Sequence, residues 1–170
     1  AEHWHWRRMR RHTLRTGITM KIYETIGSLQ PLVGKEIGVS EWVLVDQARI
    51  NQFADATGDH QWIHVDPERA KSGPFGSTIA HGFLTLSLLP TFLTSAFKIT
   101  KQSTGLNYGL DKVRFPSPVP VNSRLRGTCR LLAWDALGEN GAQMKFEMTI
   151  ECEGAPKPAC VVESIIRFFE

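Results

Sequence analysis

The chain has 170 residues, of which 42% are hydrophobic and 22% are charged, and this composition is ordinary for one globular domain. It contains no run of about 18 apolar residues, so we expect no membrane-spanning helix. Residues 1–19 hold five arginines against a single acidic residue, whereas residues 20–170 carry 15 basic and 16 acidic residues. The net charge of +3 therefore belongs to the first segment, and a nearly neutral body argues against nucleic-acid binding.

The first 19 residues differ in character from the rest of the chain. They are rich in arginine, poor in acidic residues, and lack the apolar core of a secretory signal. We expect residues 1–19 to be a disordered basic extension, with Met20 as the functional start and residues 20–170 as the single domain. An organelle transit peptide is the alternative interpretation of such a segment.

The three cysteines, Cys129, Cys152 and Cys160, are few, widely spaced and odd in number. This spacing predicts neither a disulfide framework nor a zinc site, so we expect buried or half-buried apolar side chains. Free thiols favour a reducing compartment, and we expect the protein in the cytoplasm.

The first half of the body begins with a strand and a helix. Residues 36–45 are rich in β-branched side chains and predict the strand. Asp46 then offers a helix N-cap, and Gly58 offers the glycine that ends the helix. Between them, four residues recur at the spacing of one helical face, namely Ile50, Phe53, Ala54 and Thr57.

Two further helices are expected. Asp66 and Pro67 form a start signal, in which a capping residue precedes proline at the first helical position, and this short helix should end near Gly73. Residues 79–97 are the most apolar stretch of the chain, and their length indicates a buried helix. Pro90 must kink or end that helix, because its ring removes a hydrogen bond and clashes with the preceding turn.

The second half of the chain has the period of strands. Strands are predicted at 106–115, 124–133, 142–152 and 159–169, with turn residues between them. Apolar and polar residues alternate most clearly in 142–152, which is typical of a strand with one face on a core and one in water. Helices followed by antiparallel strands predict an α+β fold in which a curled sheet wraps the apolar helix.

Asp59 and His64 are the first candidates for chemistry. Asp59 follows the glycine that ends a helix, and His64 lies five residues later, before the next cap. Two titratable groups with different ordinary pKa values on one short connection can carry out paired proton transfer. A capping aspartate and a structural histidine are the alternative interpretation, which the spacing alone leaves open.

Gly82 lies where the apolar helix is expected to begin. The first amide groups of a helix have no internal partner, and with the helix dipole they attract negative charge. An oxyanion site beside a carboxylate and an imidazole is what the addition of water to an α,β-unsaturated carbonyl compound requires. Close packing is the alternative explanation of this glycine.

The stretch from Phe53 to Gly82 resembles the MaoC-like dehydratase family, which includes (R)-specific enoyl-CoA hydratases and NodN-like proteins. The family pattern is approximately F-A-x-x-x-G-D-x-N-P-x-H-x-D, followed by F-G-x-x-I-A-H-G. The matching residues are Phe53, Ala54, Gly58, Asp59, His64, Asp66, Phe75, Gly76, Ile79, Ala80, His81 and Gly82. The resemblance continues through residues 113–119 and covers about residues 35–170, outside the basic extension.

One departure from the pattern lies between the acid and the base. The usual Asn-Pro pair is Gln61-Trp62 here, a variant that resembles the NodN-like branch. Gln61 keeps an amide, whereas the bulkier Trp62 would narrow or reshape the pocket. The acid/base pair is intact, so the departure concerns the preference for the acyl chain.

The resemblance implies a single hotdog fold and a homodimer with acyl-thioester tunnels near its interface. It implies reversible hydration of a trans-2-enoyl thioester, carried by CoA or an acyl carrier protein, to an (R)-3-hydroxyacyl thioester. Asp59 and His64 would activate the water, and the Gly82 amide would polarise the thioester carbonyl. We expect no metal and no cofactor, because acid/base groups and an oxyanion donor suffice. The expected substrate-binding residues are Gln61, Trp62, Phe75, Ile79, Ala80, His81 and Phe83.

His81 competes with His64 for the role of reacting histidine. Its neighbours Ala80 and Gly82 place it at a helix start, so we expect it to order the loop rather than react. His60, next to Asp59, is expected to face solvent.

Two alternative functions stay open. The first is another thioester enzyme on the same fold, either a 3-hydroxyacyl-carrier-protein dehydratase or a thioesterase, which directs water at the carbonyl carbon instead of C3. The second is a non-catalytic acyl-binding subunit that keeps the fold. Release of free CoA from crotonyl-CoA would identify a thioesterase, and substitution of Asp59 or His64 tests for a binding subunit.

Overall fold

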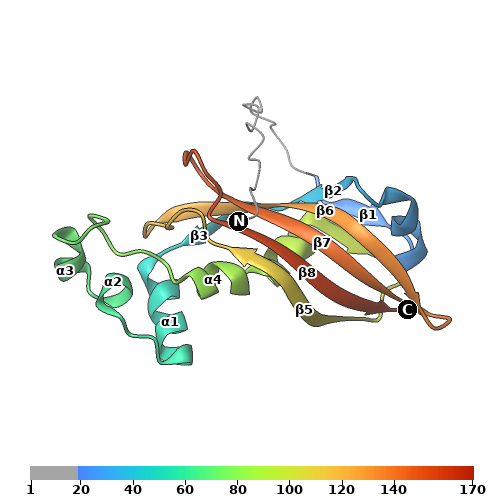
Figure 1. Ribbon diagram of the computed structural model, residues 1–170, viewed down its shortest axis with the longest axis horizontal. Coiled ribbons are helices and arrows are strands. Elements are labelled where there is room, and N and C mark those ends of the chain that lie inside the picture. The colour runs from blue at the N-terminus through green and yellow to red at the C-terminus, as the bar shows by residue number, and fades with distance from the viewer. Residues whose placement is uncertain (1–18) are drawn as a thin grey trace, which may run out of the picture.

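The computed structural model describes residues 19–170 (Figure 1). The helices are the 3₁₀-helix η1 (Ile26–Leu32) and the α-helices α1 (Gln47–Thr57), α2 (Trp62–Val65), α3 (Pro67–Lys71), α4 (Gly82–Ser87) and α5 (Leu89–Ala96). The strands are β1 (Lys21–Tyr23), β2 (Glu36–Val39), β3 (Val43–Val45), β4 (Phe97–Ile99), β5 (Thr104–Arg114), β6 (Ser123–Leu137), β7 (Gly141–Cys152) and β8 (Cys160–Phe169). We expected residues 1–19 to be a disordered extension. Of these residues the structure describes Thr19 alone, so this expectation lies outside the described residues.

Six strands form one antiparallel sheet in the order β2-β6-β7-β8-β5, with β3 also paired to β6. A separate parallel pair joins β1 to β4. Figure 1 shows α4 beneath the curved strands and α1, α2 and α3 gathered at one end of the sheet. The predicted α+β layout, with an apolar helical segment against a curled antiparallel sheet, is confirmed. Among residues 19–170, no helix is long and apolar enough to cross a membrane.

The alternation predicted for residues 142–152 is present in β7. Its side chains alternate between buried and half-buried along the whole strand, because successive residues of a strand point to opposite faces. The buried face of β7 consists of Ala142, Met144, Phe146, Met148, Ile150 and Cys152. All three cysteines are buried and free, as the sequence predicts.

Two glycines let α5 lie directly on the sheet. A Cβ on Gly127 of β6 would lie 3.0 Å from the Cβ of Phe92, and one on Gly38 of β2 would lie 2.5 Å from the backbone oxygen of Ala96. Any larger residue at these positions would push the helix away. Phe92 is fully buried at this contact, so the glycines fix the depth of the helical segment that begins at Gly82.

The single strand predicted over residues 36–45 is wrong, because the structure divides it into β2 and β3. Ser40 lies fully buried between them. Its hydroxyl accepts the Gly127 N–H at 2.8 Å and donates to the Glu41 carbonyl at 2.8 Å. The Ser40 hydroxyl thus accepts the Gly127 N–H in place of a strand carbonyl, while the Ser40 N–H still donates to the Gly127 carbonyl at 2.8 Å. Only one of the two bonds of a regular strand pair remains there.

The helix predicted over residues 79–97 starts later and is broken. It begins at Gly82 and is interrupted at Leu88, while Ile79 forms an isolated bridge with Pro120. Pro90 lies in the first turn of α5, where the missing N–H is not needed. The sequence did not predict β1, η1 or α2, because segments of three to seven residues carry no clear periodic pattern.

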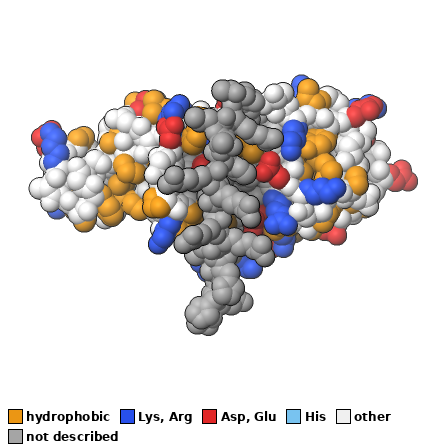
Figure 2. Space-filling view, turned by 90° about the horizontal axis from the view of Figure 1, so that it is seen from above, with side chains coloured by type: hydrophobic (Ala, Val, Ile, Leu, Met, Phe, Trp, Pro, Cys, Tyr) orange, Lys and Arg blue, Asp and Glu red, His pale blue; other side chains and the backbone are white. Residues whose placement is uncertain are grey.

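The side of the molecule seen in Figure 2 carries both signs of charge. Lys and Arg side chains are interspersed there with Asp and Glu. Arg126 of β6 pairs with Glu151 of β7 at 2.6 Å, and Arg124 pairs with Glu153 beside it. The opposite charges within each of these two pairs offset one another, so this part of β6 and β7 gains no net charge from them.

Candidate active site

Asp59 is placed by the end of α1. Asp46 caps the start of this helix by accepting the Arg49 N–H at 2.9 Å. Gly58 ends the helix with a left-handed backbone conformation (φ 78°), and its N–H donates to Ala54 at 2.8 Å. The chain reverses there, and the Asp59 side chain remains 55% exposed. A carboxylate at this turn can meet both the protein and a solvent water.

His64 is placed by α2, the short helix that the sequence did not predict. The residue is 7% exposed, and its Nδ1–H donates to the Ile79 carbonyl at 2.7 Å. A carbonyl oxygen can only accept, so this bond assigns the proton of the neutral ring to Nδ1. Nε2 therefore carries a lone pair, which is the form that a general base requires.

The pKa of His64 lies below its ordinary value of 6.5. Burial is the main cause, because it penalises the charged ring. The hydrogen bond to Ile79 opposes this effect, the neighbouring His81 adds to it, and the charge of Asp59 opposes it. The ring is consequently neutral at pH 7 and able to take a proton.

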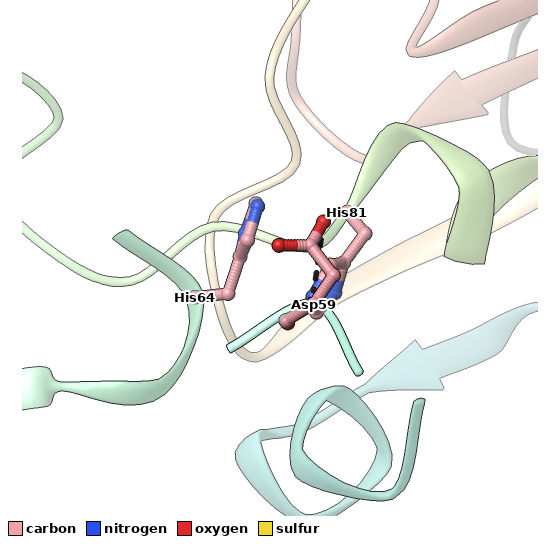
Figure 3. A group of neighbouring side chains, drawn as sticks. All are labelled: Asp59, His64 and His81. Atoms are coloured by element: carbon pink, nitrogen blue, oxygen red, sulfur yellow. Dashed lines mark hydrogen bonds and ion pairs between the residues drawn. The ribbon is translucent and has the colours of Figure 1, made fainter. Parts of the chain in front are cut away.

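Asp59, His64 and His81 are neighbours in space (Figure 3). A carboxylate oxygen and one nitrogen from each ring lie within 4.8 Å of one another. The rings of the two histidines stack with centroids 3.8 Å apart. His81 is 2% exposed, and its Nε2–H donates to the Asp59 backbone carbonyl at 2.9 Å. The proposed pair is therefore brought together by the tertiary structure, with His81 touching both members.

A carboxylate and two imidazoles at this spacing are also groups that could hold a metal ion. The two ring planes are 25° apart and stacked, so their in-plane lone pairs do not converge on a point close to both rings. This geometry fits a proton-transfer pair better than a metal centre, and the expectation of no metal stays a prediction.

Gly82 begins α4, directly after His81. The Thr85 N–H donates to the His81 carbonyl at 3.2 Å, so the amides of Gly82 and its two successors precede the first bond of the helix. A Cβ on Gly82 would lie 3.2 Å from the Phe115 ring, which leaves little room for any side chain there. The position predicted for the oxyanion donor is thus at the helix start and beside the stacked histidines.

A hydrogen-bond network that no sequence pattern predicted holds the backbone of His64 in place. Gln47, the first residue of α1, donates its amide to the His64 carbonyl at 2.8 Å and accepts the Thr78 hydroxyl at 2.6 Å. The Ile79 N–H donates to the Ile63 carbonyl at 3.0 Å, which holds Ile79 where its own carbonyl accepts the His64 Nδ1–H. A glutamine after a helix cap resembles an ordinary surface residue, so no pattern in the sequence distinguishes it.

The other predicted substrate-binding residues are dispersed. Ile79 and Ala80 are buried in the loop before α4. Gln61 is exposed at the start of α2, and Trp62 packs under the guanidinium of Arg69 at 4.4 Å. Two phenylalanines face solvent, with Phe75 46% exposed and Phe83 70% exposed. His60 is exposed, as expected, and its Nε2 lies 2.9 Å from Asp55.

The structure contains a cavity of about 400 Å³ between α4–α5 and strands β5 and β8. Leu86, Leu89 and Leu93 line its helical wall, and Leu110 and Ile166 line its strand wall. None of the aromatic side chains expected to form an acyl pocket is among its lining residues. The cavity's size is within the range of about 300–1,000 Å³ for ligand pockets.

Comparison with known families gives one match over most of the chain. The sequence model of the family described as "MaoC like domain" matches residues 28–149. This range contains Asp59, His64, His81 and Gly82, and it ends within β7.

Two relatives share about half of their residues with this chain. A protein named 3-hydroxyacyl-thioester dehydratase Z, from Mycobacterium tuberculosis, is 52% identical over 149 residues, which cover 88% of this chain and 99% of that protein. Nodulation protein N from Rhizobium leguminosarum is 51% identical over 140 residues, covering 80% and 87%. A solved structure of a MaoC-like dehydratase from Rhodospirillum rubrum superposes with a TM-score of 0.67 at 20% identity, covering 81% of this chain and 92% of that one.

Proposed function

The chain belongs to the MaoC-like dehydratase family and is a hydro-lyase, and from this premise we propose that it is an (R)-specific enoyl-CoA hydratase. The proposed reaction adds water reversibly to a trans-2-enoyl thioester and gives an (R)-3-hydroxyacyl thioester. A catalyst accelerates both directions, so this activity is the reverse of the 3-hydroxyacyl-thioester dehydration named for the Mycobacterium tuberculosis relative.

One observation carries the proposal, namely the meeting of a neutral buried imidazole with an exposed carboxylate. His64 Nε2 has a lone pair because Nδ1–H is held by the Ile79 carbonyl. A carboxylate oxygen of Asp59 lies within 4.8 Å of a nitrogen of that ring. One water between these two groups can hydrogen-bond to both, which orients it and leaves its oxygen free to attack.

The proton and electron movements follow from this arrangement. His64 takes one proton from the water as the water oxygen bonds to C3 of the enoyl thioester. The electron pair of the C2–C3 double bond moves to C2 and is delocalised onto the thioester oxygen as an enolate. Protonated His64 then supplies the proton that bonds to C2, which restores its neutral ring, and the carbonyl re-forms. Asp59 holds the water and stabilises the imidazolium that forms in between.

The start of α4 supports the enolate. The Gly82 N–H has no acceptor within its helix, and it follows the histidine that stacks on His64. A donor of this kind, aimed at developing oxyanion charge, contributes about 3–4 kcal/mol to barrier lowering in other enzymes. With acid/base groups and this donor in place, the proposed reaction requires neither a metal nor a redox cofactor.

The acyl chain would extend from this centre into the cavity under α4 and α5. The helical wall of the cavity begins at Leu86, four residues after Gly82, which is about 6 Å along a helix axis. The wall is mainly apolar, as an acyl chain requires. The carrier of the thioester, CoA or an acyl carrier protein, would remain at the exposed side, where Phe75 and Phe83 face solvent.

A homodimer is also proposed, joined along β5. This strand ends the sheet, and it pairs with β8 alone among the described strands. Its Leu106, Tyr108 and Leu110 are 53%, 57% and 45% exposed. An edge with free backbone groups and apolar side chains favours pairing with a second copy about a two-fold axis. We further propose a cytoplasmic location, where the three free buried thiols would stay reduced.

Hydration of crotonyl-CoA tests the proposed function. The loss of enoyl absorbance reports hydration, chiral separation of the product identifies the (R)-3-hydroxyacyl form, and a thiol reagent reports free CoA. We expect loss of absorbance without free CoA. Release of free CoA alone would instead identify a thioesterase. If the protein turns over none of crotonyl-CoA, longer enoyl-CoAs and enoyl-carrier-protein substrates, the proposed function is wrong. The non-catalytic acyl-binding subunit is then the remaining alternative.

A further inference from the structure

The cavity under α4 and α5 is not uniformly apolar. Its helical side consists mainly of leucine side chains, and the one hydroxyl there, on Ser87, already donates to the Phe83 carbonyl. Its strand side includes Asn107 of β5 and Ser164 of β8. Asn107 is paired with Ile166 of β8, and Ser164 lies two residues before Ile166. Residues in this diagonal relation point to the same face of a sheet. One wall of the cavity therefore presents an amide and a hydroxyl to the leucines opposite.

Ser164 is a buried polar group without a partner. The residue is 4% exposed, and its Oγ has no hydrogen-bond partner among residues 19–170. It occupies an inward position of β8 between Val162 and Ile166, and its cross-strand neighbours are Phe146 and Leu110. All four neighbours are apolar, so none can satisfy the hydroxyl. A strand that otherwise directs valine and isoleucine inward would be more stable with an apolar residue here.

We propose that this cavity binds an acyl chain that carries a hydrogen-bonding oxygen, such as a hydroxyl or keto group, and that Ser164 selects for it. The inference rests on the proposed function, since it assigns the substrate class of the same site. An oxygen placed opposite Ser164 satisfies the unpaired hydroxyl, with the Asn107 amide close by on the same wall. A plain alkyl chain leaves that hydroxyl unpaired. Sites built to bond a substrate oxygen discriminate against analogues that lack it.

The test compares trans-2-enoyl-CoAs of one medium chain length. One is plain, and the others carry a single hydroxyl at successive carbons beyond C4, so that one isomer places its oxygen opposite Ser164. We expect wild-type protein to prefer one isomer over the plain chain by about tenfold in kcat/KM, the equivalent of one hydrogen bond. In Ser164→Ala the ratio of the two kcat/KM values should fall to about one, because no hydroxyl distinguishes the chains.

Two controls make the outcome specific. Thr149→Ala removes a hydroxyl from the outer, half-buried face of β7, and this variant should keep the wild-type ratio. Thermal unfolding of Ser164→Ala should occur at the same or a higher temperature than wild type, because an unpaired buried hydroxyl is lost. A clear decrease would show that the hydroxyl already has a partner and would overturn the inference.

The remaining outcomes separate this inference from the proposed function. If wild-type protein hydrates the plain chain and treats all isomers alike, the inference fails while the proposed function stands. The same conclusion follows if Ser164→Ala retains the preference. If wild-type protein hydrates no enoyl thioester at all, the proposed function fails and this inference fails with it.

Discussion

The imidazole rings of His64 and His81 stack with their centroids 3.8 Å apart and their planes 25° apart. His81 also donates its Nε2–H to the Asp59 carbonyl at 2.9 Å, so one buried side chain contacts both members of the candidate pair. Asp59 lies on an exposed loop, and His64 lies on a helix of four residues. Neither element would hold its side chain rigidly by itself. The stack and the hydrogen bond together explain how the two groups keep a fixed relation.

Substitution of the candidate pair gives the first prediction. Asp59→Asn and His64→Gln should each lower the hydration rate by about 10²–10⁴-fold, because such groups contribute this much to proton transfer. The rate is followed by the loss of crotonyl-CoA absorbance, and circular dichroism checks that each variant folds. Asp55→Asn is the matched control, since Asp55 is an exposed carboxylate on α1 that pairs with His60. An active Asp59→Asn variant would remove Asp59 from the mechanism.

The pH dependence gives the second prediction. The pKa of His64 is lowered by burial, and the neutral ring is the active form. The kcat/KM for hydration should therefore rise with pH through the lowered pKa, which lies below 6.5, and stay level above it. The fall of kcat/KM at low pH is the acidic limb of this profile. If the residual activity of His64→Gln lacks this limb, the limb belongs to His64. A limb that persists unchanged in that variant would belong to another group.

The second prediction has a second measurement, because the lowered pKa of His64 also makes the folding stability depend on pH. The unfolded chain protonates His64 at the ordinary value of 6.5, whereas the folded chain resists protonation until a lower pH. Between these two values the unfolded state binds more protons, so stability falls as pH decreases through this window. Thermal unfolding of wild type and His64→Gln across this range should diverge, with the wild type losing more stability. Parallel curves would contradict the lowered pKa.

His81 gives the third prediction. His81→Phe keeps an aromatic ring against His64 but loses the donor to the Asp59 carbonyl. We expect kcat to fall by about tenfold to a hundredfold through misplacement of Asp59, with a smaller change in KM. His81 contributes to the lowered pKa of His64, so the acidic limb should also move to higher pH in this variant. A change in KM alone would indicate that His81 contacts substrate instead of positioning the pair.

The edge strand gives the fourth prediction. Leu106→Glu on β5 should shift the protein from dimer to monomer, because a charge on the exposed apolar edge opposes pairing between copies. Sedimentation velocity measures the mass, with 19.1 kDa expected for one chain and twice that for wild type. Val33→Glu, at an exposed apolar residue after η1, is the control and should remain dimeric. A monomeric wild type would exclude the proposed homodimer.

Much of the fold could be predicted because its elements are long or are bounded by clear capping and terminating residues. The cap at Asp46 and the glycine at position 58 bound α1 as expected. The four long strands appear within a few residues of their predicted ranges, since alternation over ten residues or more is a strong pattern. The short elements could not be predicted for the opposite reason. The division between β2 and β3 depends on Ser40 meeting Gly127, a contact between residues far apart in the chain.

The order of residues by itself determined which groups are available for chemistry: an aspartate after a helix-ending glycine, a histidine five residues later, and a glycine at the start of the apolar helix. Only the tertiary structure decided their relation. The Ile79 carbonyl assigns the proton of His64, and the ring of His81 stacks on the ring of His64. The cavity between helix and sheet, with its unpaired Ser164 hydroxyl, likewise has no counterpart in the local sequence. Protonation and burial depend on neighbours in space, and those neighbours are brought together by folding.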